Sequence, residues 1–492
     1  MEYSIKQFIS KGLVSAIVIL LLLFGCNSSD DSFSEDTDGP GTSSGELGDL
    51  QDIGDLSGGS GETWYYTKIM AISEDGSVVG QSNNGTPARA AFIWDASTEE
   101  MTYLGIHEDG AYDDYYNLTE EESDSDEYFI YSEAVGISSS GDAIGNSTTG
   151  TNWPDETKKR AFYWKNGEFT DLSPGYYQIN FEIDDVEYNY YVMKSFSEAI
   201  CMNEDYVLVN IRDKTGTHAY YWDKSSRKTI EVVDDEYEGY QEGEDKDEDE
   251  PYAVSIEVPD YSILGNSRED DSEAVAINSN NQAIMNMGNT VVFHDLETGT
   301  VEYLNGLPGA DSTVAVAINE SGHIAGTSGS EAFLWVSGVM YPCGDLGGGQ
   351  SVATGLNNND QVVGYSYNED GELRAFLWEL VDGEGKMTDL GTLGGDSSWA
   401  LGINDNGLII GASGTGDIYN EGSQKADIYH ACVWYNDEVY DLGVPTDYYD
   451  YSVADAYPFS EGFAVNEDNR IAGNAYTINE SSRGFILDPT LP

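Results

Sequence analysis

Four glutamates that share one sequence context are the residues of this chain best suited to bind a cation. Glu133, Glu198, Glu273 and Glu461 each follow a serine and precede a short, mostly apolar segment. Carboxylate oxygens are ligands that Ca²⁺ prefers, and a group of them also attracts organic cations. We therefore predict a ligand site at these four residues, with Ca²⁺ held by Glu133, Glu198 and Glu273. The alternative is that each glutamate is a solvated charge at a loop end or pairs with a neighbouring backbone amide.

Trp399 occupies the same position in another part of the chain. It follows Ser398 after a short, glycine-rich connection at 394–397. An aromatic ring beside a short loop can stack on a sugar ring, whereas a tryptophan packed in the interior is the alternative. We predict that Trp399 belongs to the ligand site.

The sequence contains no set of residues typical of a catalytic centre. The histidines are dispersed, and two of them, His218 and His430, fall at one position of a repeat, so they form no nucleophile–base pair. Cys201, Cys343 and Cys432 are too widely spaced for a zinc pattern, and their odd number gives no disulfide framework. Cys432 replaces a recurring aromatic residue, which predicts a buried thiol. We assign no catalytic residue.

The candidate residues are positioned by an internal repeat. Eight copies align on an apolar anchor that Asn follows in most of them: Ile72, Ile137, Met202, Ile277, Ile318, Leu356, Ile403 and Val465. Five residues before every anchor stands a hydroxyl residue: Thr67, Ser132, Ser197, Ser272, Thr313, Ser351, Ser398 and Ser460. A period of about 40 residues, lengthened by insertions, is typical of repeat architectures. The candidate residues directly follow the hydroxyl residue, so they share one structural position.

Each copy contains four β-like segments, of the types Ala-x-x-Ile-Asn, Val-Val-Gly, Ala-Phe-x-Trp and Asp-Leu-Gly. A tight turn rich in Asn and Gly joins the first two, which suits a hairpin. Four antiparallel strands repeated eight times predict an all-β fold, an eight-bladed β-propeller of four-stranded blades. The eighth copy lacks its Asp-Leu-Gly segment, whereas residues 52–58 match residues 389–395. We expect this N-terminal strand to close the last blade.

A seven-bladed propeller and an open β-solenoid are the alternatives.

Three motifs are most complete in the later copies: Asp-Leu-Gly-Thr-Leu-Gly-Gly at 389–395, Ala-Leu-Gly-Ile-Asn at 400–404 with Gly407, and His430-Ala431. Together they resemble the HAF family of extracellular repeat proteins, which is named for a His-Ala-Phe tripeptide. The chain departs from that family because arginine replaces the histidine in other copies (Arg160, Arg374 and Arg483). The resemblance covers residues 50–488 and implies an exported repeat protein with no defined enzymatic activity.

Insertions gather on one face of the expected propeller. They fall between the fourth segment and the next first segment (106–131, 176–195, 234–271 and 446–459) and between the second and third segments (146–159 and 412–429). Both connections leave a four-stranded antiparallel blade on the same face, and insertions collected on one face usually build a binding surface. Because the glutamate position opens the innermost strand, these glutamates should partly ring the channel mouth.

The N-terminus predicts a bacterial lipoprotein. Lys6 and Lys11 precede an apolar stretch at 13–24, and a small residue before Cys26 resembles the lipoprotein cleavage box. We predict a signal peptide at 1–25, lipid attachment at Cys26, an acidic flexible tether at 26–47 and one propeller domain at 48–492. Asn27 and the acidic residues after it look like signals for display on the outer membrane, facing the cell exterior.

The charge balance narrows the range of partners. The 492 residues include 90 Asp and Glu against 21 Lys and Arg, a net charge of -69. Such a charge repels nucleic acids and anionic membranes. We expect a monomer that binds no nucleic acid and touches the membrane only through lipid at Cys26.

These observations favour a non-enzymatic binding or adhesion lipoprotein whose insertion-bearing face binds a glycan, a protein or a cation. One alternative is a polysaccharide hydrolase or lyase that uses mouth carboxylates and tyrosines as acid and base. Another is a structural acidic coat protein without a specific ligand.

Overall fold

The computed structural model folds most of the chain into β-strands joined by turns. It describes residues 47, 50–56, 66–83, 89–104, 131–148, 159–172, 176–183, 186–193, 196–213, 216–226, 228–232, 254–258, 261–264, 271–381, 383–421, 424–444, 459–476 and 482–492. Within these residues the regular elements are the strands β1–β36, and no helix occurs that could span a membrane. The prediction of an all-β fold is confirmed.

Four antiparallel sheets of four strands each follow the sequence repeat, with their strands in chain order from one edge to the other. They consist of β12 (Phe196–Met202), β13 (Tyr206–Asp213), β14 (Gly216–Asp223) and β17 (Tyr261–Ile263); β18 (Ser272–Ile277), β19 (Gln282–Met287), β20 (Thr290–Asp295) and β21 (Thr300–Leu304); β22 (Thr313–Ile318), β23 (Ile324–Ser328), β24 (Glu331–Val336) and β25 (Val339–Pro342); and β26 (Gly347–Leu356), β27 (Val362–Asn368), β28 (Leu373–Val381) and β29 (Glu384–Asp389).

Two larger sheets each contain two such units, which meet at a single parallel residue pair, Arg89 with Tyr131 and Tyr429 with Phe459. The first sheet holds β2 (Thr67–Ile72), β3 (Val78–Asn83), β4 (Arg89–Asp95), β5 (Glu100–Tyr103), β6 (Tyr131–Ile137), β7 (Ala143–Thr148), β8 (Lys159–Lys165) and β9 (Glu168–Asp171). The second holds β30 (Ser398–Ile403), β31 (Ile409–Glu421), β32 (Gln424–Tyr435), β33 (Glu438–Gly443), β34 (Phe459–Val465), β35 (Ile471–Tyr476), β36 (Ser482–Leu487) and β1 (Gln51–Asp52).

The N-terminal strand takes the fourth-strand position beside β36. β1 pairs antiparallel with β36, and the amide of Ile53 donates to the carbonyl of Gly484 at 3.2 Å. Leu172 and Ala161 make the equivalent bond at 2.8 Å in the unit of β6–β9. The segment found by matching residues 52–58 to a later copy therefore pairs where that match predicted.

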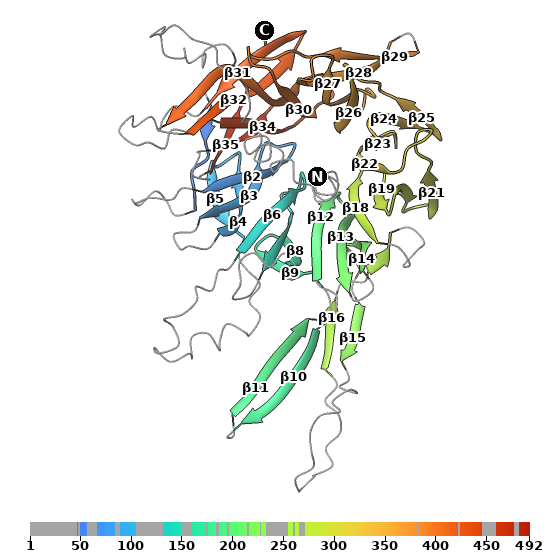
Figure 1. Cartoon of the computed structure of the whole chain (residues 1–492). Coiled ribbons are helices and arrows are strands. Elements are labelled where there is room, and N and C mark those ends of the chain that lie inside the picture. The colour runs from blue at the N-terminus through green and yellow to red at the C-terminus, as the bar shows by residue number, and fades with distance from the viewer. Residues whose placement is uncertain are drawn as a thin grey trace.

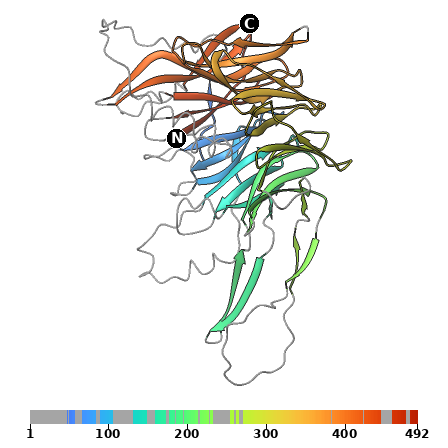
Figure 2. The ribbon, with the colours of Figure 1, turned by 45° about the vertical axis from the view of Figure 1, so that its right-hand side comes forward.

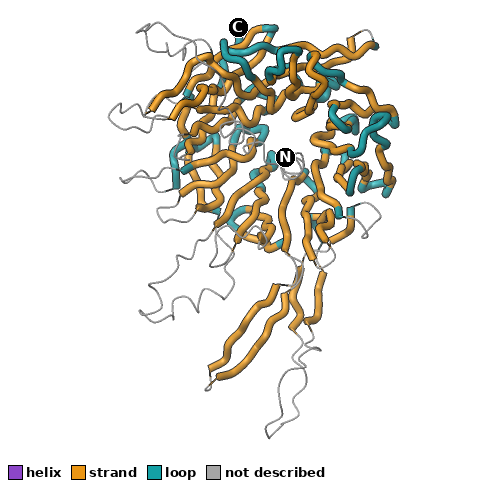
Figure 3. Tube along the Cα trace, viewed as in Figure 1, coloured by secondary structure: helices purple, strands orange, loops and turns teal. Residues whose placement is uncertain are grey.

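The units stand around a common centre, with their first strands innermost (Figure 1, Figure 3). Each first strand contacts the first strand of the next unit, in the order β2, β6, β12, β18, β22, β26, β30 and β34, and β34 also contacts β2. Radial packing of four-stranded antiparallel sheets is the arrangement of a β-propeller. The coarse prediction of a propeller built from repeats is thereby supported.

Every first strand carries a β-bulge at the same repeat position. In β26 the register with β27 shifts between Ala353 and Gly355, and the first strands of the other units shift at the equivalent place. A bulge bends its strand and increases the local twist. The glycine of Val-Val-Gly in this unit avoids a clash, because a Cβ on Gly364 would lie 1.9 Å from the carbonyl oxygen of Val352.

The hydrophobic core lies between neighbouring units. Phe293 of β20 packs in one cluster with Phe333 and Trp335 of β24. Leu334, on the other face of β24, packs in the next cluster with Phe376 of β28. Burying one such side chain contributes roughly 1.5–3 kcal/mol. The recurring Ala-Phe-x-Trp segment is therefore the part of each copy that holds the units together.

Two hairpins lie outside the units. β10 (Tyr176–Ile183) pairs with β11 (Val186–Met193), and β15 (Lys228–Val232) pairs with β16 (Val254–Val258). Both project from the same side of the molecule, beside the unit of β12–β14 (Figure 1, Figure 2).

Two sequence assignments need correction. The insertion at 234–271 was placed before a first strand, but β17 follows β15 and β16, so most of it joins the third and fourth strands of one unit. The insertion at 412–429 lies between the second and third strands of its unit, as predicted, and forms extended ends of β31 and β32.

The second correction concerns the Asp-Leu-Gly segment type: the string Asp345-Leu346-Gly347 fits it, but the fourth strand of that unit is β25, which ends at Pro342. In this unit the residue after the fourth strand that bonds to the third strand is Cys343, whose amide donates to the carbonyl of Ala332 at 2.8 Å. Leu390 makes the equivalent bond to the carbonyl of Ala375 at 2.9 Å in the next unit.

Candidate functional site

The predicted ligand residues share one structural position, as their sequence context indicated. Each follows the hydroxyl residue of a first strand: Glu133 in β6, Glu198 in β12, Glu273 in β18, Trp399 in β30 and Glu461 in β34. Since these strands are innermost, the position recurs around the centre of the ring (Figure 3).

Glu133 and Glu198 share one lysine. The Nζ of Lys159, at the start of β8, donates to Glu198 Oε1 at 2.7 Å and lies 3.6 Å from Glu133 Oε1. Asn146 Nδ2 also donates to Glu133 Oε1, at 3.4 Å. The two carboxylates thus come from neighbouring units and meet at a cation that the chain itself supplies.

This arrangement gives no support to Ca²⁺ binding through Glu133, Glu198 and Glu273. Lys159 neutralises part of the charge that a metal ion would need, and Glu273 is half-buried on β18. Across the described ranges, no group of three or more His, Cys, Asp or Glu side chains is placed to hold a metal ion.

Glu461 is a buried carboxyl group with an unusual environment. Its side chain is 3% exposed, Tyr476 donates its hydroxyl to Oε1 at 2.7 Å, and Oε2 has no hydrogen-bond partner. Burial raises the pKa of Glu461, and this effect exceeds the opposing effects of the Tyr476 hydrogen bond and the charge of Lys68. Glu461 therefore retains its proton to a higher pH than a solvated glutamate does.

Trp399 is an interior residue, so the prediction that it can stack on a sugar is wrong. It is 3% exposed, and its ring centroid lies 5.1 Å from that of Tyr429, in a cluster with Leu373 and Ala412. The short loop before it is bonded to β31, because Gly395 donates to the carbonyl of Gly414 at 3.0 Å. A short loop here tightens the packing around the ring.

Asparagines in the turns after the first strands link neighbouring units, a role that the sequence did not reveal. Asn319 Nδ2 donates to the carbonyl of Asn357 at 3.1 Å, and Asn357 Nδ2 donates to that of Asn404 at 3.0 Å. The same bond joins Asn203 to Asn278, Asn278 to Asn319, Asn404 to Asn466 and Asn466 to Ser73. The recurring Asn after the anchor, used only for alignment, was the available signal.

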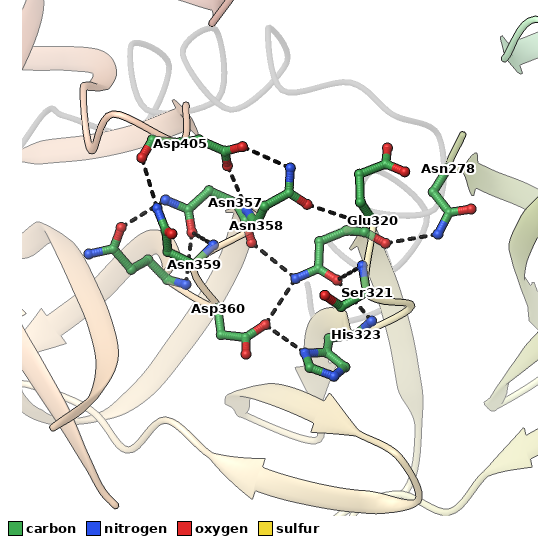
Figure 4. A network of polar contacts seen from close by, with 11 residues as sticks. Asn278, Glu320, Ser321, His323, Asn357, Asn358, Asn359, Asp360 and Asp405 are labelled. Carbon is green, nitrogen blue, oxygen red and sulfur yellow. Dashed lines mark hydrogen bonds and ion pairs between the residues drawn. The ribbon is translucent and has the colours of Figure 1, made fainter. Parts of the chain in front are cut away.

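Carboxylates on the same turns are also occupied by internal bonds. Asn358 donates its backbone amide to Asp405 Oδ1 at 2.7 Å and its side chain to Oδ2 at 2.8 Å (Figure 4). Asp405 in turn donates its backbone amide to Glu467 Oε2 at 3.0 Å. Burial raises the pKa of Glu467 against the opposing effect of this hydrogen bond, and the charges of Asp405 and Glu74 add to the rise. These acidic residues join the units to one another.

His323 and Asp360 form one more link between turns, with Nδ1 2.6 Å from Oδ1 (Figure 4). Elsewhere, the basic residue before Ala-Phe pairs with the aspartate of the fourth strand, as in His430 with Asp441 at 2.9 Å and Arg160 with Asp171 at 2.7 Å. The histidine of the repeat motif therefore connects the third and fourth strands of a unit.

The recurring hydroxyl residues connect consecutive units. Ser197 Oγ accepts from the backbone amide of Ala161 at 2.9 Å, and Ser460 Oγ accepts from that of Ala431 at 2.8 Å. The amide in each case belongs to the Ala-Phe segment of the preceding unit. The same bond is accepted by the serine of all six copies that have one: Ser132, Ser197, Ser272, Ser351, Ser398 and Ser460. Thr67 and Thr313 bond instead to Ser82 and Ser328 of their own second strands.

The three cysteines of the described part are free thiols. Cys343 and Cys432 are buried, which confirms the prediction for Cys432, and burial raises the pKa of Cys201 to about 12. Thiolate chemistry is therefore disfavoured at these positions.

Cys26, the signal peptide at 1–25 and nearly all of the tether lie outside the described residues. Leu47, the last residue of the predicted tether, is 4% exposed in a core cluster, and its carbonyl accepts from the amide of Thr490 at 2.7 Å. The folded part therefore includes Leu47.

Comparisons with known proteins give structural neighbours only. No protein-family model matches the chain, and neither does any curated protein sequence. The chain resembles the WD40 domain of SCAP from fission yeast, with 8% identity, a TM-score of 0.40 and coverage of 89% of this chain and 97% of that one. It also resembles the β-propeller domain of the Trilobed protease from Pyrococcus furiosus, with 9% identity, a TM-score of 0.37 and coverage of 74% of this chain and 94% of that one. A third neighbour is U3-55K, with 12% identity, a TM-score of 0.35 and coverage of 78% of this chain and 98% of that one. These likenesses concern the fold alone.

Proposed function

We propose that the chain is an eight-bladed β-propeller in which the N-terminal strand completes the last blade. The contacts between successive first strands, returning from β34 to β2, support this blade count. The ion pair between Arg483 and Asp52, with Nη1 3.0 Å from Oδ2, supports the closure, because Arg160 and Asp171 make the same pair within one continuous blade.

We propose that this propeller is a non-enzymatic binding or adhesion lipoprotein, displayed on the outer membrane through lipid on Cys26. One contrast carries the proposal. Polar groups of the blades and their inner turns bond to neighbouring blades, as at Lys159 and Asn357. The insertions add the hairpins β10–β11 and β15–β16, which belong to none of the four-stranded units. Binding residues usually lie on loops and insertions that a rigid scaffold positions. The ligand class remains a glycan, a protein or a cation.

Binding assays on the mature chain (residues 26–492, Cys26→Ser) test this function. We expect binding to a glycan or protein array that weakens at least tenfold when the extended β31–β32 hairpin is trimmed by deletion of residues 416–427. A matched control is Asn280→Ala, in an exposed turn between first and second strands. Absence of any bound glycan, protein or cation would leave only the coat-protein alternative. Cys26→Ser in the precursor should release the protein from the membrane fraction, and retention there would contradict lipid anchoring.

Glu461 favours a second candidate, a polysaccharide hydrolase or lyase. A carboxyl group with a raised pKa beside a tyrosine hydroxyl at 2.7 Å is a pair that could act as general acid and base. Turnover of a polysaccharide by the purified protein, abolished by Glu461→Gln and retained in Glu133→Gln, would establish this candidate over the binding protein.

A further inference from the structure

The chain enters the ring at one end of its last unit. The carbonyl of Leu47 accepts from the amide of Thr490 at 2.7 Å, just beyond the end of β36, and Leu47 packs in one core cluster with Ile471 and Leu487. Ile471 and Leu487 pair at the end of the unit where the turn between its first and second strands lies. We call this end of the units the attachment face, because residues 26–46 join the ring here.

Two of the three insertions that form strands leave the ring at the opposite end, which we call the insertion face. Neighbouring strands of an antiparallel sheet run in opposite directions. Connections from a second to a third strand, and from a fourth strand to the next first strand, therefore lie away from the attachment face. The extended hairpin of β31 and β32 is a connection of the first kind, and β10–β11 lies in one of the second kind. The hairpin β15–β16 joins a third strand to a fourth strand and so leaves at the attachment face.

We propose that lipid on Cys26 holds the attachment face toward the membrane, so that the insertion face takes its ligand from the surrounding medium and not from the membrane that carries the anchor. This inference rests on the proposed lipid anchor and binding function, and it adds the side from which the ligand arrives. The observation that carries it is the position of Leu47, at the end of the last unit away from the insertion face.

The length of the predicted tether favours this orientation. Residues 27–46 are rich in Ser, Asp and Gly, and 20 residues of such composition are expected to span about 25 Å on average. At the insertion face Ile418 pairs with Asp427. At the attachment face Glu438 pairs with Tyr435, eight residues further along β32, or about 27 Å at the rise of a β-strand. Turning the insertion face onto the membrane would stretch the tether along the whole unit, which costs conformational entropy.

The charges on the attachment face keep the ring away from the bilayer without turning it over. Glu320 and Asp405 lie in turns between first and second strands, where they accept from the amides of Ser279 at 3.2 Å and Asn358 at 2.7 Å. Carboxylates at this surface repel anionic lipids. At physiological salt the repulsion is screened within about 8 Å, which is shorter than the span expected of the tether.

Energy transfer from a dye on the protein to a dye-labelled lipid tests the orientation. The mature chain (Cys26→Ser) carries a histidine tag directly before residue 26 and binds vesicles that contain a nickel-chelating lipid, so the measurement does not depend on natural acylation. The donor dye is attached at Glu438→Cys or at Ile418→Cys, two exposed positions at opposite ends of one unit. The protein without either substitution, treated alike, gives the background from the native thiols.

We expect transfer from Glu438→Cys to be at least about twofold more efficient than from Ile418→Cys, since about 27 Å of strand separates the two positions. A protein with the tag after Pro492 is the positive control, because the bond of Thr490 to Leu47 holds the C-terminal segment at the attachment face without a tether. Thermal melts of both dye-labelled proteins should match the unlabelled protein, which excludes misfolding.

Equal transfer from the two positions would overturn the proposal, because the ring would then turn freely on its tether. Greater transfer from Ile418→Cys would overturn it as well, because the insertion face would lie on the membrane. Loss of the natural anchor is a separate result. It is measured by release of the Cys26→Ser precursor from the membrane fraction, and it leaves the outcome on vesicles unchanged.

Discussion

At the scale of single residues, one repeat position has acquired different roles in different blades. Glu133 and Glu198 neutralise Lys159, Trp399 fills the interior, and Glu461 is buried beside Tyr476. The sequence shows the shared position but not the partner, because Lys159 and Tyr476 come from neighbouring strands with no fixed offset. Only the three-dimensional packing distinguishes these residues.

Glu461→Gln should change the pH dependence of stability. The pKa of Glu461 is raised in the folded state, so the stability from its protonated form is full at low pH and declines as the pH rises through that pKa. Near pH 4 the variant and the wild type should melt alike. At pH 8 the variant should be more stable, by roughly 1–3 kcal/mol, since it has no buried charge to accommodate.

Thermal melts at both pH values provide the measurement, with Glu133→Gln as the control at the same repeat position. That control should show no gain at pH 8, because Glu133 lies near Lys159. A loss of stability in Glu461→Gln at pH 8 would show instead that an ionised Glu461 is stabilised by Lys68.

At the scale of strands and turns, the close approach of the first strand accounts for the glycine found in six of the eight second strands, among them Gly364. Gly364→Ala should destabilise the protein by roughly 1–3 kcal/mol or more, because the new Cβ would lie 1.9 Å from the carbonyl of Val352. Gly402→Ala is the matched control, since its Cβ would meet Ile410 at an ordinary 3.5 Å. Urea unfolding midpoints compare the two, and equal midpoints would disprove the close approach.

The asparagine turns make a second prediction at this scale. Asn357→Ala removes the bond to the carbonyl of Asn404 and the two bonds that Oδ1 accepts within its own turn. We expect a loss of roughly 1–3 kcal/mol, because buried partners are left unsatisfied. Asn280→Ala removes a bond to the carbonyl of Glu320 on an exposed turn and should cost less. Hydrogen exchange should increase at the Asn404 turn in the first variant only.

The sequence predicted strands and their order well but placed connections less reliably. Recurring Ser, Phe and Trp residues identified the units because they contact the preceding unit in the same way. The Asp-Leu-Gly motif predicted the wrong fourth strand at 345–347, because this string follows the strand β25 instead of forming it. At β17, where Ile263-Leu264 replaces Asp-Leu, the strand went unnoticed and the insertion was assigned to the wrong connection.

At the scale of the whole molecule, the blades form one cooperative ring only if the two ends of the chain meet. The N-terminal segment makes three interactions that the fourth strand of other units also makes. These are the strand pairing, the ion pair of Asp52 with Arg483, and the bond from Thr67 Oγ1 to the carbonyl of Gly54 at 2.7 Å. Ser460 makes the last of these bonds to Gly443 within the continuous part of the chain. The N-terminal segment therefore joins the last unit to the first as a covalently continuous strand would.

The closure should accordingly contribute as much stability as an internal blade contact. Arg483 and Asp52 are 4% and 14% exposed, against 7% and 14% for Arg160 and Asp171, so breaking either pair removes a bond of similar burial. We expect Arg483→Ala and Arg160→Ala to lower the melting temperature by similar amounts, because each removes the arginine that pairs with a largely buried carboxylate. Ile53→Asp should have a larger effect, as it places a charge in the cluster of Ile69 and Ile486, and should raise hydrogen exchange in β34–β36. Gln51→Ala, on the exposed side of β1, is the control. If Ile53→Asp changes neither the melting temperature nor hydrogen exchange in β34–β36, the first and last units hold together without β1, and the N-terminal strand contributes no stability to the ring.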